Sequence, residues 1–405
     1  MTKLFKLLFA NLLFAPMTLW AADVTITVHN DAPIQRQELV EIDAVEVTRR
    51  LGVDNGTPFI VRNQMGQEET YQITHDGKLL IDAAVKPCGQ TVFTVSVGHP
   101  APMRRWVEGK LYTMREDDIG WENDRGMYRV YGPALQRTGE KSYGIDVWTK
   151  NSKELQMSDR YYKNLEGFIA GNEKPTNDKK KWESRLQTSF HLDHGDGLDC
   201  YAVGPTLGCG APALMVNNDL LMPYCYKTYK ILDNGPLRFT VELVFNPTRV
   251  KNDPNVVEHR IISLDKGSNF NKMIVWYEGL SEPCDLAAGV VIHTADTKSV
   301  VLGKNFVQYA DPTDQPDKYG FQLYVAALFP YGAQTRMLRY GGHDDGIAGH
   351  AVGVKKALKN KERYTYYFGS AWSKYDVRCQ EEWQVRIDHY MKALERPLVA
   401  VIQQV

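Results

Sequence analysis

The sequence predicts an all-β protein with a small N-terminal β-domain, a large antiparallel β-sandwich and a short C-terminal helix. Two observations carry this prediction. Alternation of apolar and polar residues, which is the period of a half-buried strand, is far more frequent along the chain than helical spacing. The strand-like runs are also short and separated by Gly, Pro, Asn and Asp, which is typical of antiparallel sheets joined by turns.

The N-terminal domain is expected at residues 23–100, as a small β-sandwich. Its first strand lies in VTITVHND, where Val24, Ile26 and Val28 alternate with polar residues. Further strands are predicted at Phe59–Asn63, at Thr70–Ile81 with a hairpin turn at Asp76 and Gly77, and at Thr91–Gly98. Prolines at positions 100 and 102 mark the end of this domain.

Residues 101–405 are expected to form the large sandwich. Ten strand-like runs fall in this range: MYRVYG, SYGIDVWTK, YKTYKIL, LRFTVELVF, HRIISLD, NKMIVWYEGL, AAGVVIHTA, KSVVLG, FQLYVAALF and YTYYFGSAW. A C-terminal helix from Gln380 to Leu394 is predicted by an apolar stripe at helical spacing: Trp383, Ile387, Tyr390, Met391 and Leu394. The polar stretch from Gly171 to Lys181 is expected to be a solvated loop, and little helix is expected before Gln380.

The first 22 residues have the pattern of a signal peptide. Lys3 and Lys6 precede an apolar run from Leu7 to Trp20, and small residues follow at Ala21 and Ala22. The run is shorter than the roughly 20 apolar residues that a membrane span needs. We therefore expect cleavage of residues 1–22, no membrane anchor, and a mature protein that is periplasmic or secreted.

Charge and cysteine content narrow the classes of partner. The chain has 48 basic and 49 acidic residues, so its net charge is close to zero. This balance gives no reason to expect a nucleic acid as the partner. Six cysteines permit disulfides in an oxidising compartment, with Cys200 and Cys209 as the first pair to test, although buried free thiols are at least as well supported.

The first polar cluster is WENDRG, at residues 121–126. Arg125 could hold a carboxylate with two hydrogen bonds, and Asn123 could donate to a developing oxyanion. Glu122 or Asp124 could act as acid or base, and Trp121 offers an aromatic ring to a substrate. An Asx-type turn with an Arg–Asp salt bridge explains the same residues equally well.

The second cluster lies between His191 and Asp199, in HLDHGDGLD. His191 and His194 could serve as acid and base near neutral pH, while Asp196 and Asp199 could bind substrate. The alternative is a divalent metal held by His191, His194 and Asp196, but an HxxH spacing in a loop is weak evidence for one. We therefore expect no cofactor.

Further candidates come from the ends of later strands. His293 follows the apolar run GVVI, and YGGHDDG carries His343 with Asp344 and Asp345. Trp372 and Lys374, in YFGSAWSKYD, suit stacking on a sugar and contact with a uronate. A histidine at the end of a strand more often has a hydrogen-bonded structural role, and core packing explains Trp372 about as well as contact with a sugar does.

Three motifs together resemble a known family: WENDRGMYRVYGPAL, HGDGLDCYAVGPTLGCG and YFGSAWSKYD. The chain is similar to an uncharacterised family of exported proteins of polysaccharide-degrading Bacteroidota. The resemblance implies a β-supersandwich like that of galactose mutarotases and polysaccharide lyases, and a setting in the degradation of pectin-like glycans. Matching positions are Glu122, Asn123, Asp124, Arg125, His194, Asp196, Asp199, Trp372 and Lys374, whereas His191, Cys200 and Cys209 lie outside the pattern.

These observations predict an exported carbohydrate-active enzyme that acts on uronic-acid-containing oligosaccharides by β-elimination. Arg125 and Asn123 would neutralise the carboxylate, and His194 with a tyrosine or a second histidine would move the proton. A glycoside hydrolase would use Glu122, Asp124 or Asp196 instead. A mutarotase-type epimerase and a non-catalytic sugar-binding protein remain alternatives. For a single site, the clusters around Asp124 and His194 have to meet in one cleft.

Overall fold

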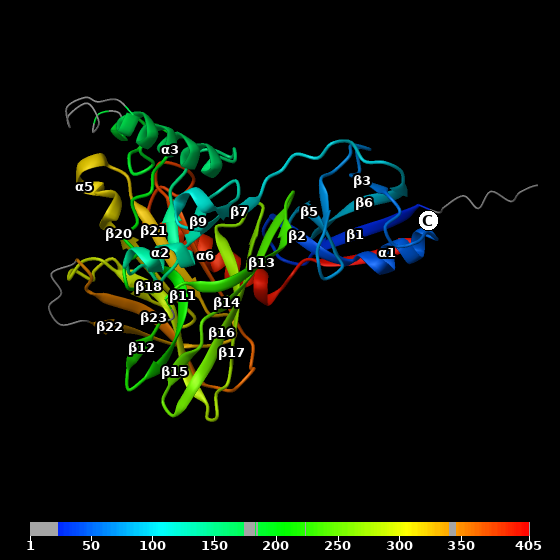
Figure 1. Cartoon of the computed structure of the whole chain (residues 1–405). Helices are drawn as coiled ribbons and strands as arrows, with labels where there is room; N and C mark the ends of the chain where they lie inside the picture. Colours follow the sequence, from blue (N-terminus) through cyan, green and yellow to red (C-terminus); the bar gives the residue numbers. More distant parts are fainter. Residues whose placement is uncertain (1–22, 174–182, 184, 223, 340–345, 405) are drawn as a thin grey trace, which may run out of the picture.

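The computed structural model describes residues 23–173, 183, 185–222, 224–339 and 346–404. Antiparallel strands dominate this part of the chain, which confirms the predicted all-β class. Figure 1 shows two units side by side, the smaller one built from the N-terminal segments in blue. No helix in the described ranges has the length and apolar character to cross a bilayer. The expected signal peptide, residues 1–22, and the candidate His343 lie outside the described residues.

The smaller unit packs two sheets and one helix around its own core. One sheet has the order β25–β1–β6–β3 and the other β2–β5–β4. Their bounds are β1 Val24–Asn30, β2 Arg36–Asp43, β3 Phe59–Arg62, β4 Tyr71–Ile73, β5 Lys78–Val85, β6 Gly89–Val97 and β25 Val399–Gln404. Because β25 pairs with β1 along its whole length, this sandwich uses the C-terminal end of the chain as well as residues 23–100.

Helix α1 (Ala44–Leu51) was not expected from the sequence, although its end signals are present. The carboxylate of Asp43 accepts hydrogen bonds from the backbone N–H groups of Val45 and Glu46, which caps the helix N-terminus. Gly52 ends the helix with φ +71°, in the left-handed region that glycine tolerates.

The large unit is a sandwich of two broad antiparallel sheets that enclose one continuous apolar core. The first sheet has the order β12–β11–β18–β23–β22, with bounds Asp219–Leu221, Cys209–Val216, Cys284–Ile292, Gly349–Leu358 and Gln334–Arg339. The second has the order β13–β14–β16–β17–β24–β21–β20–β19, with bounds Tyr226–Asn234, Arg238–Phe245, Asp253–Asp265, Phe270–Glu278, Tyr364–Trp372, Leu323–Leu328, Phe306–Asp311 and Val300–Leu302; β15 (Thr248–Val250) adds to β16.

A four-stranded sheet and several helices cover one end of this sandwich. The sheet has the order β10–β9–β8–β7, with bounds Asp146–Trp148, Met127–Val130, Asp118–Glu122 and Glu108–Tyr112. The helical elements near it are η1 (Thr113–Arg115), α2 (Pro133–Thr138), α3 (Met157–Glu173), η2 (Pro312–Asp314) and α5 (Pro316–Tyr319). Figure 1 places α3 and α5 at this end and β12 and β15 at the opposite end.

Helix α3 shows that the expectation of little helix before Gln380 was wrong. It spans 17 residues and includes Gly171–Glu173, which had been assigned to a loop. Its buried contacts come from its first turns, where Met157 and Tyr161 pack with Trp148. The weak apolar periodicity beyond these turns explains why the helix was missed.

The predicted C-terminal helix is confirmed as α6 (Gln380–Glu395). It covers the outer face of the second large sheet, where Trp383 stacks on Phe270 with ring centres 5.1 Å apart. Burial of Trp383 and Ile387, two residues of the predicted stripe, fixes the helix in this position.

Candidate functional site

The first motif forms the turn between β8 and β9. The side-chain oxygen of Asn123 accepts hydrogen bonds from the N–H groups of Arg125 and Gly126, at 2.8 and 3.0 Å. Its amide nitrogen donates to the carbonyl oxygens of Asp265 and Ser268, at 2.6 and 2.7 Å. Asn123 is completely buried. The side-chain oxygen therefore serves the β8–β9 turn, as the Asx-type alternative requires, and the amide nitrogen joins this turn to the segment between β16 and β17.

Glu122 is buried and holds the start of α3. One carboxylate oxygen accepts from the N–H groups of Gln156 and Met157, both at 2.7 Å, and the other accepts from Lys150 Nζ at 2.8 Å. Lys150 is also fully enclosed, and burial lowers its pKa although the carboxylate of Glu122 acts to raise it. A negative charge at a helix N-terminus is stabilising, so Glu122 has a structural role in this arrangement.

Asp124 and Arg125 tie the first motif to two other segments. The carboxylate of Asp124 accepts from Gly267 N–H at 2.6 Å, and Arg125 Nε donates to Gly267 O at 2.5 Å. Arg125 also forms an ion pair with Asp376, and the hydroxyl of Tyr375 donates to Asp124 O at 2.9 Å. The first and third motifs are therefore in direct contact.

Trp121 was expected to bind substrate, and the structure contradicts this. Its ring is completely buried, and its indole N–H donates to Asn271 Oδ1 at 2.7 Å. No face of the ring is open to a sugar.

The second motif is a loop organised by Asp193. One of its carboxylate oxygens accepts from the N–H groups of Gly195 and Gly197, and the other pairs with Lys374 of the third motif. Burial acts to raise the pKa of Asp193, but these hydrogen bonds lower it below its usual range. Gly197 has φ +115°, and a Cβ there would lie 2.2 Å from Thr149 O. This contact holds the loop against the segment that follows β10.

His191 keeps one ring nitrogen free of partners among the described residues. Its Nδ1 lies 3.0 Å from the carbonyl oxygen of Asp199. Because a carbonyl only accepts, Nδ1 carries the proton and Nε2 of the neutral ring keeps its lone pair. The side chain is 58% exposed, and partial burial lowers its pKa although the bond to Asp199 raises it. His194 is also exposed, and its Nε2 lies 2.9 Å from Ser189 O.

Beneath His191 lies a buried ionic network that the sequence did not reveal. Arg129 pairs with Asp146 at 2.5 Å, Asp199 at 2.9 Å and Asp118 at 3.4 Å. One guanidinium faces three carboxyl groups, and burial raises the pKa of Asp118 to about 6 and of Asp146 to about 7. Asp199, expected to bind substrate, is 4% exposed and belongs to this network. The sequence does carry one signal of this network, because two strand-like runs that are otherwise mainly apolar each contain a charged residue: Arg129 in MYRV and Asp146 in IDVW.

The third motif contributes an aromatic and cationic surface. Lys374 Nζ lies 5.1 Å from the ring centre of half-buried Phe321 and 5.4 Å from that of Trp372. Trp372 is itself only 4% exposed, and its indole N–H donates to Asp314 at 3.3 Å. Burial raises the pKa of Asp314 to about 7, and its other carboxyl oxygen is buried without a hydrogen-bond partner among the described residues.

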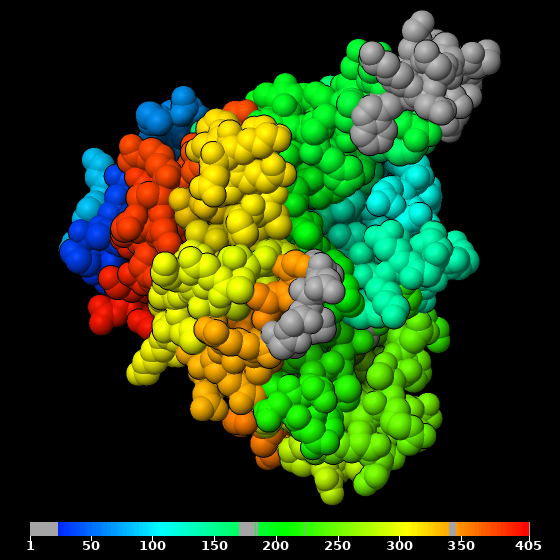
Figure 2. Space-filling view, turned by 90° about the vertical axis from the view of Figure 1, so that its left-hand side faces the viewer, coloured from blue at the N-terminus to red at the C-terminus, as the bar shows by residue number. Residues whose placement is uncertain are grey.

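A shallow hollow lies between the first and third motifs. Its cavity volume is about 10 Å³, which is room for about one water molecule. It is lined by Arg125, Gly126, Val147, Trp148, Thr149, Lys150, Leu323, Ser370, Ala371 and Trp372. In Figure 2 the green segments of the second motif and α3 lie next to the yellow segment that contains α5.

His293 and the cysteines have structural partners. His293 Nδ1 lies 2.5 Å from Asp311 and its Nε2 lies 2.5 Å from Ala202 O, so both nitrogens face acceptors. Burial acts to lower the pKa of His293, but Asp311 raises it above its usual value. Neither nitrogen is free for a substrate. Cys200 and Cys209 are both free thiols, so the disulfide considered between them is absent.

The residues suggested for a divalent metal do not fit one. His191, His194 and Asp196 each have a different partner, which for Asp196 is Arg160 at 3.6 Å. In the described ranges no group of three or more His, Cys, Asp or Glu side chains is placed to hold a metal ion.

Comparison with known proteins gives a family without an assigned activity. The family described as a domain of unknown function, DUF4861, matches residues 28–400. The chain belongs to this family. An uncharacterized protein from the Bacteroidota species Formosa agariphila shares 24% identity with this DUF4861 protein in an alignment of 404 positions that covers 93% of each chain.

Solved structures resemble the DUF4861 protein only distantly. A protein of glycosyl hydrolase family 38 from Enterococcus faecalis has a TM-score of 0.47 at 8% identity. The match covers 94% of this chain and 47% of the Enterococcus protein. An α-mannosidase from the same species has a TM-score of 0.42 at 10% identity, with 94% and 46% coverage. The chain spans about half the length of these two proteins, and at such scores their activities do not transfer to it.

Proposed function

We propose that this DUF4861 protein is an exported carbohydrate-active enzyme that cleaves uronic-acid-containing oligosaccharides by β-elimination. One observation carries the proposal: the loop that exposes the basic Nε2 of His191 also binds Lys374 through Asp193, beside the Phe321 ring. β-Elimination from a uronate needs a base and a positive charge that neutralises the carboxylate, and an aromatic ring suits contact with a sugar face.

The proposed reaction removes the proton on the carbon next to the uronate carboxylate. His191 Nε2 takes this proton, the electron pair forms the carbon–carbon double bond, and the glycosidic oxygen leaves with a proton from His194 or water. Lys374 neutralises the carboxylate, because its ammonium group has three donors and only one is engaged by Asp193. This reassigns the role first given to Asn123 and Arg125, whose described hydrogen bonds are structural.

A spectrophotometric assay tests the proposal. β-Elimination leaves an unsaturated uronate that absorbs in the near ultraviolet, whereas hydrolysis, epimerisation and binding do not produce one. Pectic, rhamnogalacturonan, alginate and ulvan-type oligosaccharides are the substrates to screen. We expect His191→Ala to lower the rate by about 10²-fold or more while binding persists. His389→Ala, an exposed histidine on α6, is the matched control and should retain full activity.

A glycoside hydrolase is the second candidate, and Asp314 favours it. A buried carboxyl group whose pKa is about 7 is protonated often enough at neutral pH to act as a general acid. If the wild type releases reducing ends without new ultraviolet absorbance, and Asp314→Asn loses this release, the enzyme is a hydrolase and not a lyase. If the protein binds a glycan but turns over none of those screened, it is a sugar-binding protein and not an enzyme of either kind.

Export is a separate part of the proposal and rests on residues 1–22. N-terminal sequencing of protein recovered from its host should begin near Asp23. Retention of Met1 on membrane-bound protein would contradict export.

A further inference from the structure

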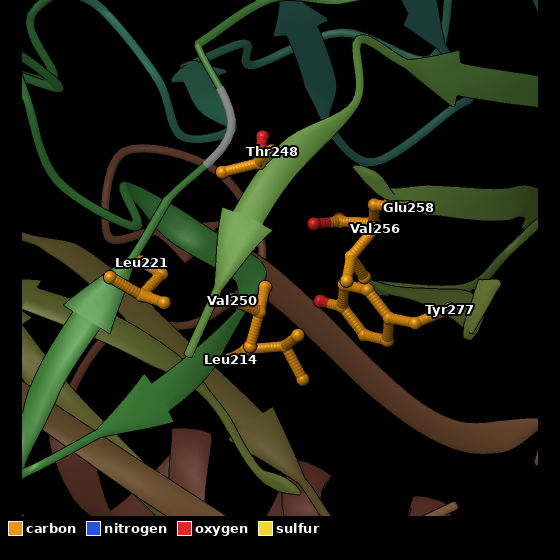
Figure 3. Close-up of a pocket in the computed structure, with 7 residues that line it drawn as sticks. All are labelled: Leu214, Leu221, Thr248, Val250, Val256, Glu258 and Tyr277. Carbon is orange, nitrogen blue, oxygen red and sulfur yellow. The ribbon is translucent and has the colours of Figure 1, made fainter. Parts of the chain in front are cut away.

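Charged side chains are buried at both ends of the large unit, and the two places differ in their balance of charge. At the end opposite the candidate site, Arg260 pairs with Glu258, and both are at most 4% exposed. Figure 3 shows Glu258 and Tyr277 beside a hollow. Its cavity volume is about 10 Å³, which is room for about one water molecule. One cation faces one carboxylate here, so the pair is balanced without a ligand.

The network around Arg129 is not balanced. Its single guanidinium lies within 3.4 Å of carboxyl oxygens from three residues that are at most 4% exposed: Asp118, Asp146 and Asp199. Full ionisation would leave two surplus negative charges away from water, which is unfavourable. Burial accordingly raises the pKa of all three carboxyl groups. A further positive charge beside this network would therefore be stabilised.

His191 is an exposed group in contact with the network. Its Nδ1 lies 3.5 Å from Asp199 Oδ2, which is the oxygen that pairs with Arg129, and 3.0 Å from Asp199 O. Phe190 packs against the imidazole with ring centres 4.6 Å apart, and it also packs on Trp148 at 4.6 Å. These contacts orient the ring with Nδ1 toward the network.

Opposing influences set the pKa of His191. Burial is the largest of them and lowers the pKa. The positive charges of Arg129 and Arg115 lower it further, whereas the hydrogen bond to Asp199 and the charge of Asp146 raise it. The ring is therefore neutral at rest near neutral pH, as a base has to be. The carboxylates oppose the desolvation cost of the imidazolium that forms when Nε2 accepts a proton.

We propose that Asp199 is a positioning residue for His191 and that its carboxylate, held by Arg129, stabilises the imidazolium form. The backbone carbonyl of Asp199 keeps the proton of the neutral ring on Nδ1, and the carboxylate supplies negative charge 3.5 Å away. Asp199 is too deeply buried to touch a substrate. Use of this imidazolium in proton transfer rests on the proposed lyase reaction, whereas the electrostatic coupling between Asp199 and His191 does not.

NMR titration of the histidine rings in the full chain tests this coupling without a substrate. Asp199→Asn keeps the backbone carbonyl and the size of the side chain but removes its charge, so we expect the pKa of His191 to fall by about one unit. His194 is the internal control, because its ring contacts Ser189 O and forms no ion pair in the described ranges, and its titration should stay the same. Asp388→Asn, which removes an exposed carboxylate on α6, should leave the titration of His191 unchanged.

Activity gives a second readout on the glycan identified in the screen. Asp199→Asn should lower kcat by about tenfold with little change in KM, and should move the acidic limb of the pH–rate profile about one unit lower. A shifted His191 in a protein without activity on any glycan would contradict the lyase and support the coupling. An unchanged pKa of His191 in folded Asp199→Asn would overturn the coupling and leave the lyase standing.

The wild type provides a test that holds even if Asp199→Asn fails to fold. Nitrogen chemical shifts of the neutral ring distinguish its two tautomers. We expect the proton of His191 on Nδ1, facing Asp199 O. A neutral ring with its proton on Nε2 would overturn the positioning role.

Discussion

Replacement of Asn123 by alanine separates a structural role for the first motif from a catalytic one. The buried side chain makes four hydrogen bonds, two as acceptor in its own turn and two as donor to the β16–β17 turn. Each is worth roughly 1 kcal/mol, and the groups left behind are buried, so Asn123→Ala should lower the free energy of unfolding by about 4 kcal/mol. A catalytic oxyanion donor would cost rate and leave stability nearly unchanged.

Urea denaturation measures the effect. Asn255→Ala, an exposed position on β16, is the matched control and should change the free energy of unfolding by less than about 0.5 kcal/mol. Activity on the glycan identified in the screen, corrected for the folded fraction, should be the same for Asn123→Ala and the wild type. A loss of stability below about 1 kcal/mol, or a fall in kcat of about 10²-fold in fully folded protein, would refute the structural assignment.

Three further predictions follow from the site. Because burial raises the pKa of Asp146 to about 7, the stability conferred by its protonated form is fully present below the ordinary Asp pKa of about 3.9 and is lost as the pH rises from there through 7. Asp146→Asn should therefore reduce the fall in melting temperature between about pH 4.5 and pH 7.5. Gly197→Ala should lower the melting temperature by several degrees, since its Cβ would lie 2.2 Å from Thr149 O, and an unchanged melting curve would contradict that packing. Lys374→Met should raise KM and lower kcat/KM on uronate substrates by about 10-fold or more but spare neutral glycans, and equal losses on both would argue against a carboxylate contact.

The alternation of apolar and polar residues was enough to predict most strands and the class of fold. This alternation predicts strands well because every second residue of a sandwich strand faces the core and is apolar, as are the buried Val24, Ile26 and Val28 of β1. Helix α6 was found for the same reason, since Trp383 and Ile387 anchor its apolar stripe. Helix α3 was missed because only its first turns are buried, and β25 was missed because its partner β1 lies at the other end of the chain.

For the site, the sequence by itself determined which segments are unusual. The three motifs meet in space, as expected of a single site: Asp124 and Arg125 contact the third motif, and Asp193 binds Lys374. Their polar composition and glycines were sufficient signals, because packing does not require such residues in loops.

Only the tertiary structure decided what each polar residue does. Asn123 and Glu122 look like catalytic groups in the sequence, but their partners are backbone groups of the β16–β17 turn and of α3. His191 and His194 each have one ring nitrogen held by a backbone carbonyl oxygen, of Asp199 and Ser189 respectively, which the spacing of the two histidines did not reveal. A hydrogen bond depends on distances between residues remote in sequence, and composition carries no information about those distances.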